Sequence, residues 1–340
     1  MNTNKLTHGS RHLVPLSMIL IAMCVKAYSN VTIDGLNYDL YQSAKTAMLL
    51  NYNKWEGELE IPSEVTYEGN TYTVTSMSWL AFYNCKTLTK VKIPKTIQHI
   101  YHINAYPDCK NPFTGCTSLE AIEVDEENLW MCSIDGALFN KDKTMLYCYP
   151  VGAKRESYTV PEGVTWIGGA AFANDSSLVS VQLPNTLTYM SFSIFADCTS
   201  LEEVSIPNSL TYIAASTFEH CYSLKWLDIP ANITIFGENV FRGCTFKALV
   251  FRGVFDEDLR KDTFYSLGSS TIIYAQPSEI YKFQKVFSGT VLPLENYVPT
   301  DIPNIEREQN SYLMYDLNGR ITTLPQKGIY IQNGKKRHIE

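Results

Sequence analysis

The sequence lacks the short motifs that mark the common enzyme active sites. It has no Gly-x-Ser-x-Gly turn, no His-Glu-x-x-His pair, no glycine-rich phosphate loop and no Cys-x-x-Cys. Histidine is also scarce, with 6 copies in 340 residues, and His8 and His12 lie close to the N-terminus. We therefore expect a non-enzymatic protein that uses no cofactor.

Basic residues are in short supply relative to acidic ones. The chain has 28 Lys and Arg against 35 Asp and Glu, a formal net charge of −7, and no stretch rich in Lys or Arg. A nucleic-acid-binding surface needs such a basic patch, so nucleic acid is not expected among the partners. Charged residues make up 19% of the chain and apolar residues 45%, which is the balance of an ordered protein rather than a disordered one.

Beyond its N-terminus the chain has no apolar run of membrane-spanning length. Residues 13–25 are mostly apolar but too few to cross a bilayer comfortably, and Lys5 and Arg11 precede them. The small-x-small pattern Ala-Tyr-Ser follows at 27–29, as it does at a signal-peptide cleavage site. We expect residues 1–29 to be a signal peptide, so that the mature protein has no transmembrane segment.

A lipid anchor at Cys24 is the alternative to simple cleavage. A lipidated cysteine needs a small residue in front of it, and Met23 is large, so cleavage near Ser29 is the main expectation. Either route exports the protein, which would then be secreted or displayed at the cell surface.

What the chain does have is repetition at a fixed spacing. The pattern Phe-x-x-Cys-x-x-Leu-x-x-Val-x-Ile-Pro begins at Phe195 and returns 23 residues later at Phe218, and a close variant begins 23 residues earlier at Phe172. A period in the twenties is typical of a solenoid, in which each repeat buries its apolar face only by stacking on its neighbours. The Phe and Cys positions that this pattern assigns to the repeats are Phe82, Cys85, Phe113, Cys116, Phe172, Phe195, Cys198, Phe218, Cys221, Phe241 and Cys244.

The chain contains 9 cysteines, and an exported protein invites a disulfide interpretation. Five of them, however, occupy one repeat position, where stacked repeats would point their side chains the same way. We expect these five to be buried thiols that fill space in the core, with Asp175 at the same position in one repeat. Cys132 and Cys148 flank an expected β-hairpin and could form a disulfide with each other.

The pattern divides the chain into segments. An Asp-Gly turn at 34–35 predicts an opening hairpin. Pro277 predicts the start of a short helix, to about Phe287, that caps the far end of the repeats. The expected segments are a signal peptide at 1–29, an N-terminal β cap at 30–75, the repeat solenoid at 76–298 with a β-hairpin insertion at about 125–157, a linker at 299–310 and a β tail at 311–340.

The repeated pattern, continued by x-x-Leu-x-x-Ile and recurring between residues 76 and 251, resembles the BspA-like leucine-rich repeats of bacterial surface proteins. The resemblance implies a β-rich leucine-rich-repeat solenoid, placed in the α/β class by convention. It would be right-handed, with short parallel strands, few helices and one C-terminal capping helix. Members of the family act as adhesins or other binding proteins, some toward host matrix proteins. Residues 314–336 are similar to C-terminal sorting segments of the same bacterial phylum, so the tail is a possible sorting segment.

One column of aromatic residues is a candidate binding surface. Trp166, Tyr189 and Tyr212 share a position on the second strand of their repeats and would lie side by side. Rigid aromatic rings suit a contact surface, but the same column could simply stiffen the stack. Trp226 lies on the first strand, beside an outward lane of mixed polar residues, and is the fourth candidate.

A metal site is not expected. The residue types of His99, His102, Cys109 and Cys116 could bind zinc. Against this, His99 lies at a strand position of the repeat and Cys116 is one of the expected core thiols.

Together these features predict a secreted or surface-displayed binding or adhesion protein that uses a rigid repeat surface for protein–protein recognition. The expected partner is a macromolecule, namely a host matrix protein, a host cell-surface protein or a polysaccharide. Two alternatives stay open: a structural component of the cell envelope, and a carbohydrate-binding accessory protein that uses the aromatic column.

Overall fold

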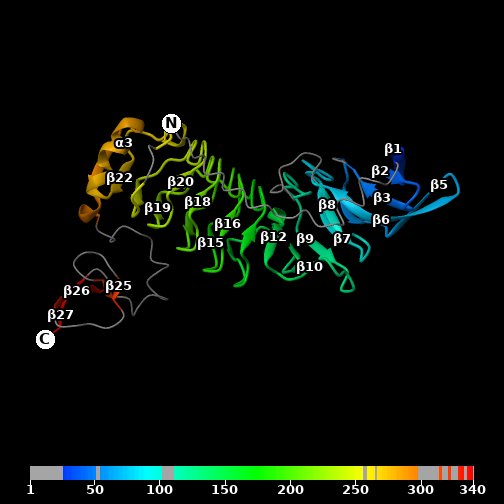
Figure 1. The fold of residues 1–340 in the computed structure, drawn as a ribbon, viewed down its shortest axis with the longest axis horizontal. Coiled ribbons are helices and arrows are strands. Elements are labelled where there is room, and N and C mark those ends of the chain that lie inside the picture. The colour runs from blue at the N-terminus through cyan, green and yellow to red at the C-terminus, as the bar shows by residue number, and fades with distance from the viewer. Residues whose placement is uncertain are drawn as a thin grey trace, which may run out of the picture.

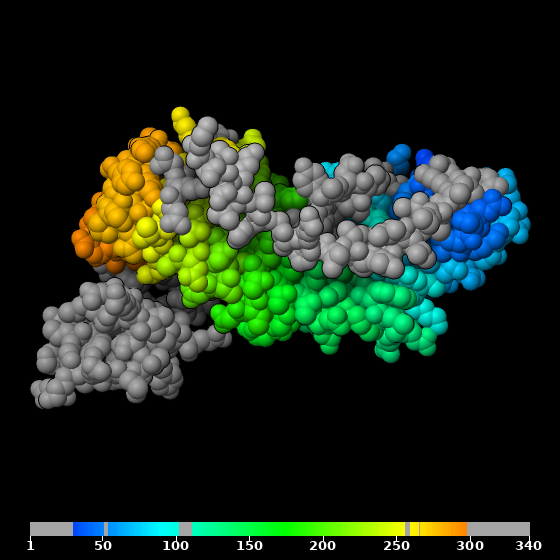
Figure 2. Space-filling view, in the orientation of Figure 1, coloured from blue at the N-terminus to red at the C-terminus, as the bar shows by residue number. Residues whose placement is uncertain are grey.

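The molecule is an elongated stack of short strands. The computed structural model describes residues 26–50, 54–101, 111–255, 259–264 and 266–297, and four strands of the tail. Figure 1 shows the strands following one another along the long axis, from β1 at one end to α3 at the other. The space-filling view shows that these repeats form one continuous body (Figure 2). As expected, strands predominate and helices are few and short.

The N-terminal sheet covers one end of the stack. Its strands are β1 (Lys26–Ile33), β2 (Leu36–Tyr41), β3 (Thr46–Leu49), β6 (Asn70–Ser78) and β5 (Glu64–Tyr67), in that order, with β8 (His99–Tyr101) also on β6. β1 and β2 form an antiparallel hairpin whose turn residues, Asp34 and Gly35, both have positive φ, as the sequence predicted. β6 then pairs in parallel with β8, so the sheet leads directly into the repeats.

The first strand of each repeat joins a parallel ladder. The ladder consists of three sheets. The first contains β4 (Gly57–Glu60), β7 (Leu88–Ile93) and β9 (Ala121–Val124), and the second contains β13 (Ser157–Thr159), β15 (Ser180–Gln182) and β17 (Glu203–Ser205). The third contains β19 (Trp226–Ile229), β21 (Ala248–Phe251), β22 (Ile272–Ala275) and β23 (Thr290–Pro293). Val181 is opposite Val204, so adjacent strands are displaced by one whole repeat. The ladder already includes β4, which lies within the expected N-terminal cap.

The second strands form another parallel ladder. It comprises β14 (Trp166–Ile167) with β16 (Tyr189–Met190), and β18 (Tyr212–Ile213) with β20 (Ile235–Phe236). The expected hairpin between Cys132 and Cys148 corresponds to β11 (Ala137–Asn140) and β12 (Met145–Cys148), and β10 (Met131–Ile134) precedes it and pairs with β11. β12 is antiparallel to β11 and parallel to β14, so the inserted hairpin extends this ladder.

The turn between the ladders explains the Phe and Cys of the pattern. The residue before each cysteine position has positive φ, from 58° to 79°, in Asn84, Gly115, Asn174, Asp197, His220 and Gly243. The Phe rings stack from repeat to repeat, with centroids 5.3 Å apart for Phe172–Phe195 and 5.7 Å apart for Phe195–Phe218. The Phe195 N–H donates to the carbonyl of Thr217 in the next repeat (2.9 Å), so the turns are hydrogen-bonded to each other as well.

The repeated cysteines are buried free thiols, as expected. Each donates to a backbone carbonyl of the preceding repeat: Cys198 to Phe172 (3.1 Å), Cys221 to Phe195 (3.1 Å), Cys244 to Phe218 (2.9 Å), Cys116 to Phe82 (3.0 Å) and Cys85 to Trp55 (3.3 Å). The side chain therefore fills a core position and adds a hydrogen bond between successive repeats.

A disulfide between Cys132 and Cys148 is not formed, since both are free. The two lie on β10 and β12, with β11 between them. Residues two strands apart are about 10 Å from each other, beyond the roughly 7 Å between Cα atoms that a disulfide spans.

Short helices close the C-terminal end of the repeats. These are α2 (Lys261–Phe264), η2 (Pro277–Glu279) and α3 (Ile280–Val286); η1 (Val151–Ala153) and η3 (Leu294–Asn296) are single turns elsewhere. The helix expected from Pro277 is thus η2 followed by α3. Phe283 of α3 packs against Phe251 (centroids 4.6 Å apart) and Phe264 (5.6 Å), which covers the last repeat. The tail contains β24 (Met314–Tyr315), β25 (Ile321–Thr322), β26 (Gly328–Gln332) and β27 (Lys335–Ile339).

Two hydrophobic cores fill the stack, and β11 separates them. Leu138 belongs to the core that begins at Leu36, and Phe139 to the core that extends to Phe287. Successive residues of a strand point to opposite faces, so one short strand contributes to both cores.

Several expectations lie partly or wholly outside the described residues, including most of the signal peptide and the linker at 299–310. β1 already begins at Lys26, within the expected signal peptide. The right-handed sense of the solenoid and the segment boundaries stay predictions. None of the helices in the described part of the chain has the length and hydrophobicity needed to cross a lipid bilayer.

Candidate functional site

The aromatic column lies on the second-strand ladder. Trp166 and Tyr189 are opposite each other in β14 and β16, and their rings are parallel within 6°, with centroids 6.1 Å apart. Tyr212 lies on β18 opposite Ile235, which is 58% exposed. All three aromatic side chains are half-buried, and burial raises the pKa of Tyr212. The column is therefore partly engaged in packing and partly available at the surface.

The first-strand ladder presents the other large surface. We call its outward side the first-strand face, made of two columns of residues: Lys90, Ala121, Ser157, Ser180, Glu203, Trp226, Ala248 and Ile272; and Lys92, Glu123, Thr159, Gln182, Ser205, Asp228, Val250 and Tyr274. Between these columns, the alternate residues such as Val181 and Val204 point into the core. The face thus runs across all three first-strand sheets.

At its N-terminal end the first-strand face is charged and internally neutralised. Lys90 Nζ is 2.5 Å from Glu123, and Lys92 Nζ is 3.7 Å from Glu60. The hydrogen bond to Glu123 raises the pKa of Lys90. Each of these ammonium groups is matched by a carboxylate from a neighbouring strand.

Toward the C-terminal end the face becomes apolar and hollow. Here Ala248 lies between Trp226 and Ile272 in one column, and Val250 lies between Asp228 and Tyr274 in the other. A pocket of about 470 Å³ opens over this region, and we call it the Trp226 pocket. Its lining residues are Lys225, Trp226, Thr245, Phe246, Lys247, Ala248, Ser270, Ile272, Tyr274 and Tyr297.

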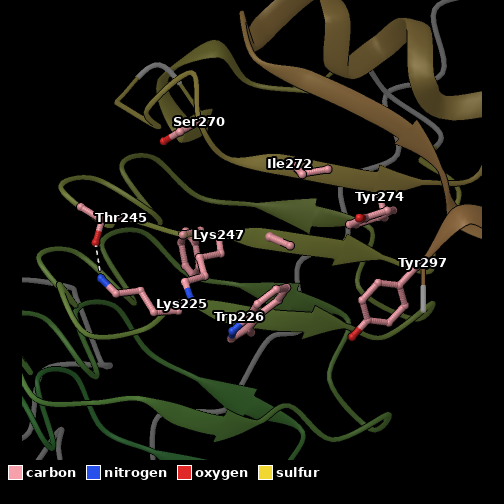
Figure 3. Close-up of a pocket in the computed structure, with 10 residues that line it drawn as sticks. Lys225, Trp226, Thr245, Lys247, Ser270, Ile272, Tyr274 and Tyr297 are labelled. Atoms are coloured by element: carbon pink, nitrogen blue, oxygen red, sulfur yellow. Dashed lines mark hydrogen bonds between the residues drawn. The ribbon is translucent and has the colours of Figure 1, made fainter. Parts of the chain in front are cut away.

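The Trp226 pocket has a cationic side and an aromatic side. Lys225, Thr245 and Lys247 lie on one side of Trp226 and Tyr297 on the other (Figure 3). Lys225 Nζ donates to Thr245 Oγ1 and to the carbonyl of Tyr222, both at 2.5 Å. Lys247 Nζ is 6.0 Å from the centre of the Trp226 ring.

Further contacts fix the rest of the pocket. The rings of Tyr274 and Tyr297 are 5.2 Å apart, which joins the sheet to the segment after η3. At the edge of the pocket, Arg252 makes two hydrogen bonds to the Asp228 carboxylate, of 2.7 and 2.6 Å. That bidentate pair neutralises the Asp228 carboxylate.

The four predicted binding residues fall on two ladders. Trp166 and Tyr189 are in ring contact, Tyr212 follows on the same ladder, and Trp226 belongs to the first-strand face. Sequence reasoning missed the rest of the pocket. Aligning the strand at Trp226 with the one at Ala248 would have shown two lysines in equivalent positions, whereas nothing in the repeat pattern points to Tyr297.

The described residues contain no group of three or more His, Cys, Asp or Glu side chains that could hold a metal ion. Of the zinc-type residues that the sequence offered, His102 and Cys109 lie outside the described residues. The Cys116 thiol donates to the Phe82 carbonyl, as the other core thiols do.

Parallel ladders offset by one repeat, joined by turns that carry a buried Phe and Cys, define a leucine-rich repeat protein. A family model of the BspA type leucine rich repeat region matches residues 63–141 and 146–289, in 6 copies. The chain belongs to this family, in agreement with the resemblance noted in the sequence.

Solved structures of similar proteins share little sequence with the chain. The pneumococcal vaccine antigen PcpA is 18% identical, with 79% of this chain and 99% of that chain covered and a TM-score of 0.49. A leucine rich cell surface protein from Faecalibacterium prausnitzii A2-165 is 18% identical, with 76% and 98% covered and a TM-score of 0.46. A leucine-rich repeat protein from Bacteroides ovatus ATCC 8483 is 22% identical, with 78% and 77% covered and a TM-score of 0.38. No curated protein matches the chain.

Proposed function

We propose that the chain is a non-enzymatic, exported binding protein, and that its repeats form a right-handed solenoid whose first-strand face recognises another protein. The observation that carries the proposal is the face itself, which extends over three first-strand sheets and ends in an aromatic pocket. Each repeat is hydrogen-bonded to the next through its ladders and turns. Such a surface loses little conformational entropy on binding, because it is already ordered.

The distribution of side chains supports a protein partner. The middle of the face carries neutral polar groups, among them Ser180, Gln182 and Ser205, and the C-terminal end carries Trp226 and Tyr274. Protein interfaces combine a small aromatic centre, which supplies most of the affinity, with a polar surround that excludes water. Membership of the BspA-type family agrees with a role in adhesion at the surface of a bacterium.

A binding experiment with matched variants tests the proposal. The exported chain is immobilised and probed by biolayer interferometry with a panel of purified extracellular matrix proteins and polysaccharides. Gln182→Glu with Ser205→Glu places two negative charges in the middle of the first-strand face. We expect at least one matrix protein to bind the parent chain and its Kd to rise about tenfold in this variant, the loss of a typical anchor contact.

The control variant carries the same double substitution on the second-strand ladder instead of the first-strand face. Thr188 and Thr211 are exposed, lie next to the aromatic column and are one repeat apart, like Gln182 and Ser205. Thr188→Glu with Thr211→Glu is expected to leave binding unchanged. Loss of binding in this control alone would overturn the proposal and locate recognition at the aromatic column.

Two results would favour the alternatives. Replacing Trp166, Tyr189 and Tyr212 by Ala removes the aromatic column. Binding of polysaccharides alone, abolished by this triple variant, would indicate a carbohydrate-binding accessory protein. Absence of binding to every panel member would favour a structural role in the cell envelope.

A further inference from the structure

The Trp226 pocket lies where the small residue Ala248 is flanked by two larger residues of its column. Ala248 is 2% exposed and forms the floor, while Trp226 and Ile272, its neighbours on either side, stand higher. Tyr297 arrives from outside the repeats and encloses the far side. A volume of about 470 Å³ is enough for one large side chain and its immediate neighbours.

The two lysines of the pocket differ from the other cations of the first-strand face. Lys90, Lys92 and Arg252 are each within 4.0 Å of a carboxylate on a neighbouring strand. Lys225 and Lys247 form no ion pair with any carboxylate among the described residues, although the chain as a whole is acidic. Two unmatched ammonium groups beside an apolar hollow favour a ligand that brings its own negative charge.

The polar groups of the pocket select among anionic ligands. The lining residues contain ammonium and hydroxyl groups but no carboxylate, side-chain amide or guanidinium group. A sugar hydroxyl both donates and accepts, and among the lining side chains only the hydroxyls of Thr245, Ser270, Tyr274 and Tyr297 can accept. An apolar side chain next to a carboxylate needs only an aromatic wall and a cation, and Trp226 with Lys225 and Lys247 supplies both.

We infer that the Trp226 pocket anchors an acidic polypeptide segment of the partner. A large apolar or aromatic side chain enters between Trp226 and Tyr297, and an adjacent Asp or Glu carboxylate is held by Lys225 and Lys247. This inference rests on the proposed function and adds the chemistry of the partner: an acidic stretch interrupted by an aromatic or aliphatic residue.

Short synthetic peptides test the inference directly. The probe is fluorescein-labelled Glu-Glu-Phe-Glu-Glu, and its binding to the full exported chain is followed by fluorescence anisotropy. Glu-Glu-Ala-Glu-Glu lacks the anchor, Lys-Lys-Phe-Lys-Lys reverses the charge, and a labelled oligouronate supplies carboxylates on sugar rings. We expect the first peptide to bind about tenfold more tightly than each of the other three probes. Its Kd should also rise with salt concentration, because the contact with the lysines is screened.

Variants connect binding to the pocket. Lys225→Glu with Lys247→Glu reverses both charges, and Trp226→Ala removes the aromatic wall. Each is expected to raise the Kd of the Phe peptide about tenfold or more. Lys90→Glu with Lys92→Glu makes the same change of charge at the other end of the face and should raise it less than about twofold. Far-ultraviolet circular dichroism verifies that each variant is folded.

Each contrary result has a distinct meaning. An unchanged Kd in the Lys225 and Lys247 variant, or tighter binding of the oligouronate than of the Phe peptide, would overturn the inference. If no peptide binds but the Gln182 and Ser205 variant still abolishes binding of a matrix protein, the inference fails and the proposed function stands. If the peptide binds the pocket but substitutions on the first-strand face leave the Kd of the matrix protein unchanged, the proposed function fails instead.

Discussion

At the scale of single residues, one repeat position holds a thiol in five repeats and a carboxyl group in a sixth. Asp175 is fully buried, and its Oδ1 accepts from the N–H groups of Ser177 (2.8 Å) and Leu178 (3.0 Å). Oδ2 has no hydrogen-bond partner among the described residues. Burial raises the pKa of this carboxyl group above its ordinary value of 3.8. The folded state therefore holds the Asp175 proton more tightly than the unfolded state does.

The raised pKa of Asp175 leads to a prediction for the variant Asp175→Asn. In the parent chain, the contribution of Asp175 to stability is greatest below the ordinary pKa of the carboxyl group and declines as the pH rises through the raised, folded-state pKa. Asn keeps the oxygen that accepts from Ser177 and Leu178 but carries no charge. Because Asn has no charge to bury at either pH, we expect the free energy of unfolding of the variant, relative to that of the parent, to be about 1 kcal/mol higher at pH 7 than at pH 4. Urea denaturation at pH 4 and pH 7 measures the difference.

The control for this prediction is Asp142→Asn. Asp142 is exposed in the loop between β11 and β12, so its neutralisation should change stability little at either pH. A larger loss of stability for Asp175→Asn at pH 7 than at pH 4 would contradict the account of Asp175.

At the scale of the repeated elements, the turn is held by the same thiol contact along the stack. Burial raises the pKa of Cys116 and of Cys244 to about 12, and raises that of Cys198 and Cys221 as well. The thiolate is the reactive form of cysteine. Burial therefore protects these thiols from alkylation and oxidation in two ways, because it blocks access to the sulfur and keeps the thiol protonated. The cysteines of the turn thus act as buried hydrogen-bond donors that connect successive repeats.

The prediction is that the turn cysteines resist alkylation in the folded protein. Iodoacetamide at pH 8 is expected to leave Cys198, Cys221 and Cys244 unmodified, and to modify all three in 6 M guanidinium. Cys132, which is only partly buried on β10, serves as the internal comparison and should react first. Mass spectrometry of tryptic peptides follows the labelling. Labelling of Cys221 at the rate of Cys132 would show that the turns open in the native state.

At the scale of the whole molecule, β11 lies between the two cores and contributes side chains to both. Leu138 is buried in the N-terminal core and Phe139 in the C-terminal core, each 0% exposed. In a repeat array, stability is a sum of the repeats and their interfaces, so damage at one position is felt mostly by its neighbours. The two faces of β11 should therefore act on different halves of the stack.

Two neighbouring substitutions test this division. Phe139→Ala is expected to cost about 3–5 kcal/mol and Leu138→Ala about 2–5 kcal/mol. Hydrogen exchange read by mass spectrometry should show faster exchange of β14 and β16 in the Phe139 variant, and of β7 and β9 in the Leu138 variant. The same exchange pattern in both variants would show that the stack unfolds as one unit.

Much of the fold could be predicted from the sequence, because the residue pattern within each repeat specifies the strands and turns of that repeat. The apolar positions that alternate around Val204 specify a strand, and the proline after Ile206 ends it. The spacing of 23 residues then fixes which strands pair, and the structure has Tyr158, Val181 and Val204 in consecutive register. The buried Phe and Cys positions followed from the same regularity.

The sequence by itself thus determined the family, the parallel ladders and the burial of the repeated Phe and Cys residues. Only the tertiary structure decided that β11 divides two cores and that Tyr297 meets Trp226 over a hollow at Ala248. It also decided which lysines of the face find a carboxylate and which do not. The physical reason is that periodicity encodes contacts between equivalent positions, whereas a pocket arises where the repeats differ and where a segment from outside them packs on the last strands.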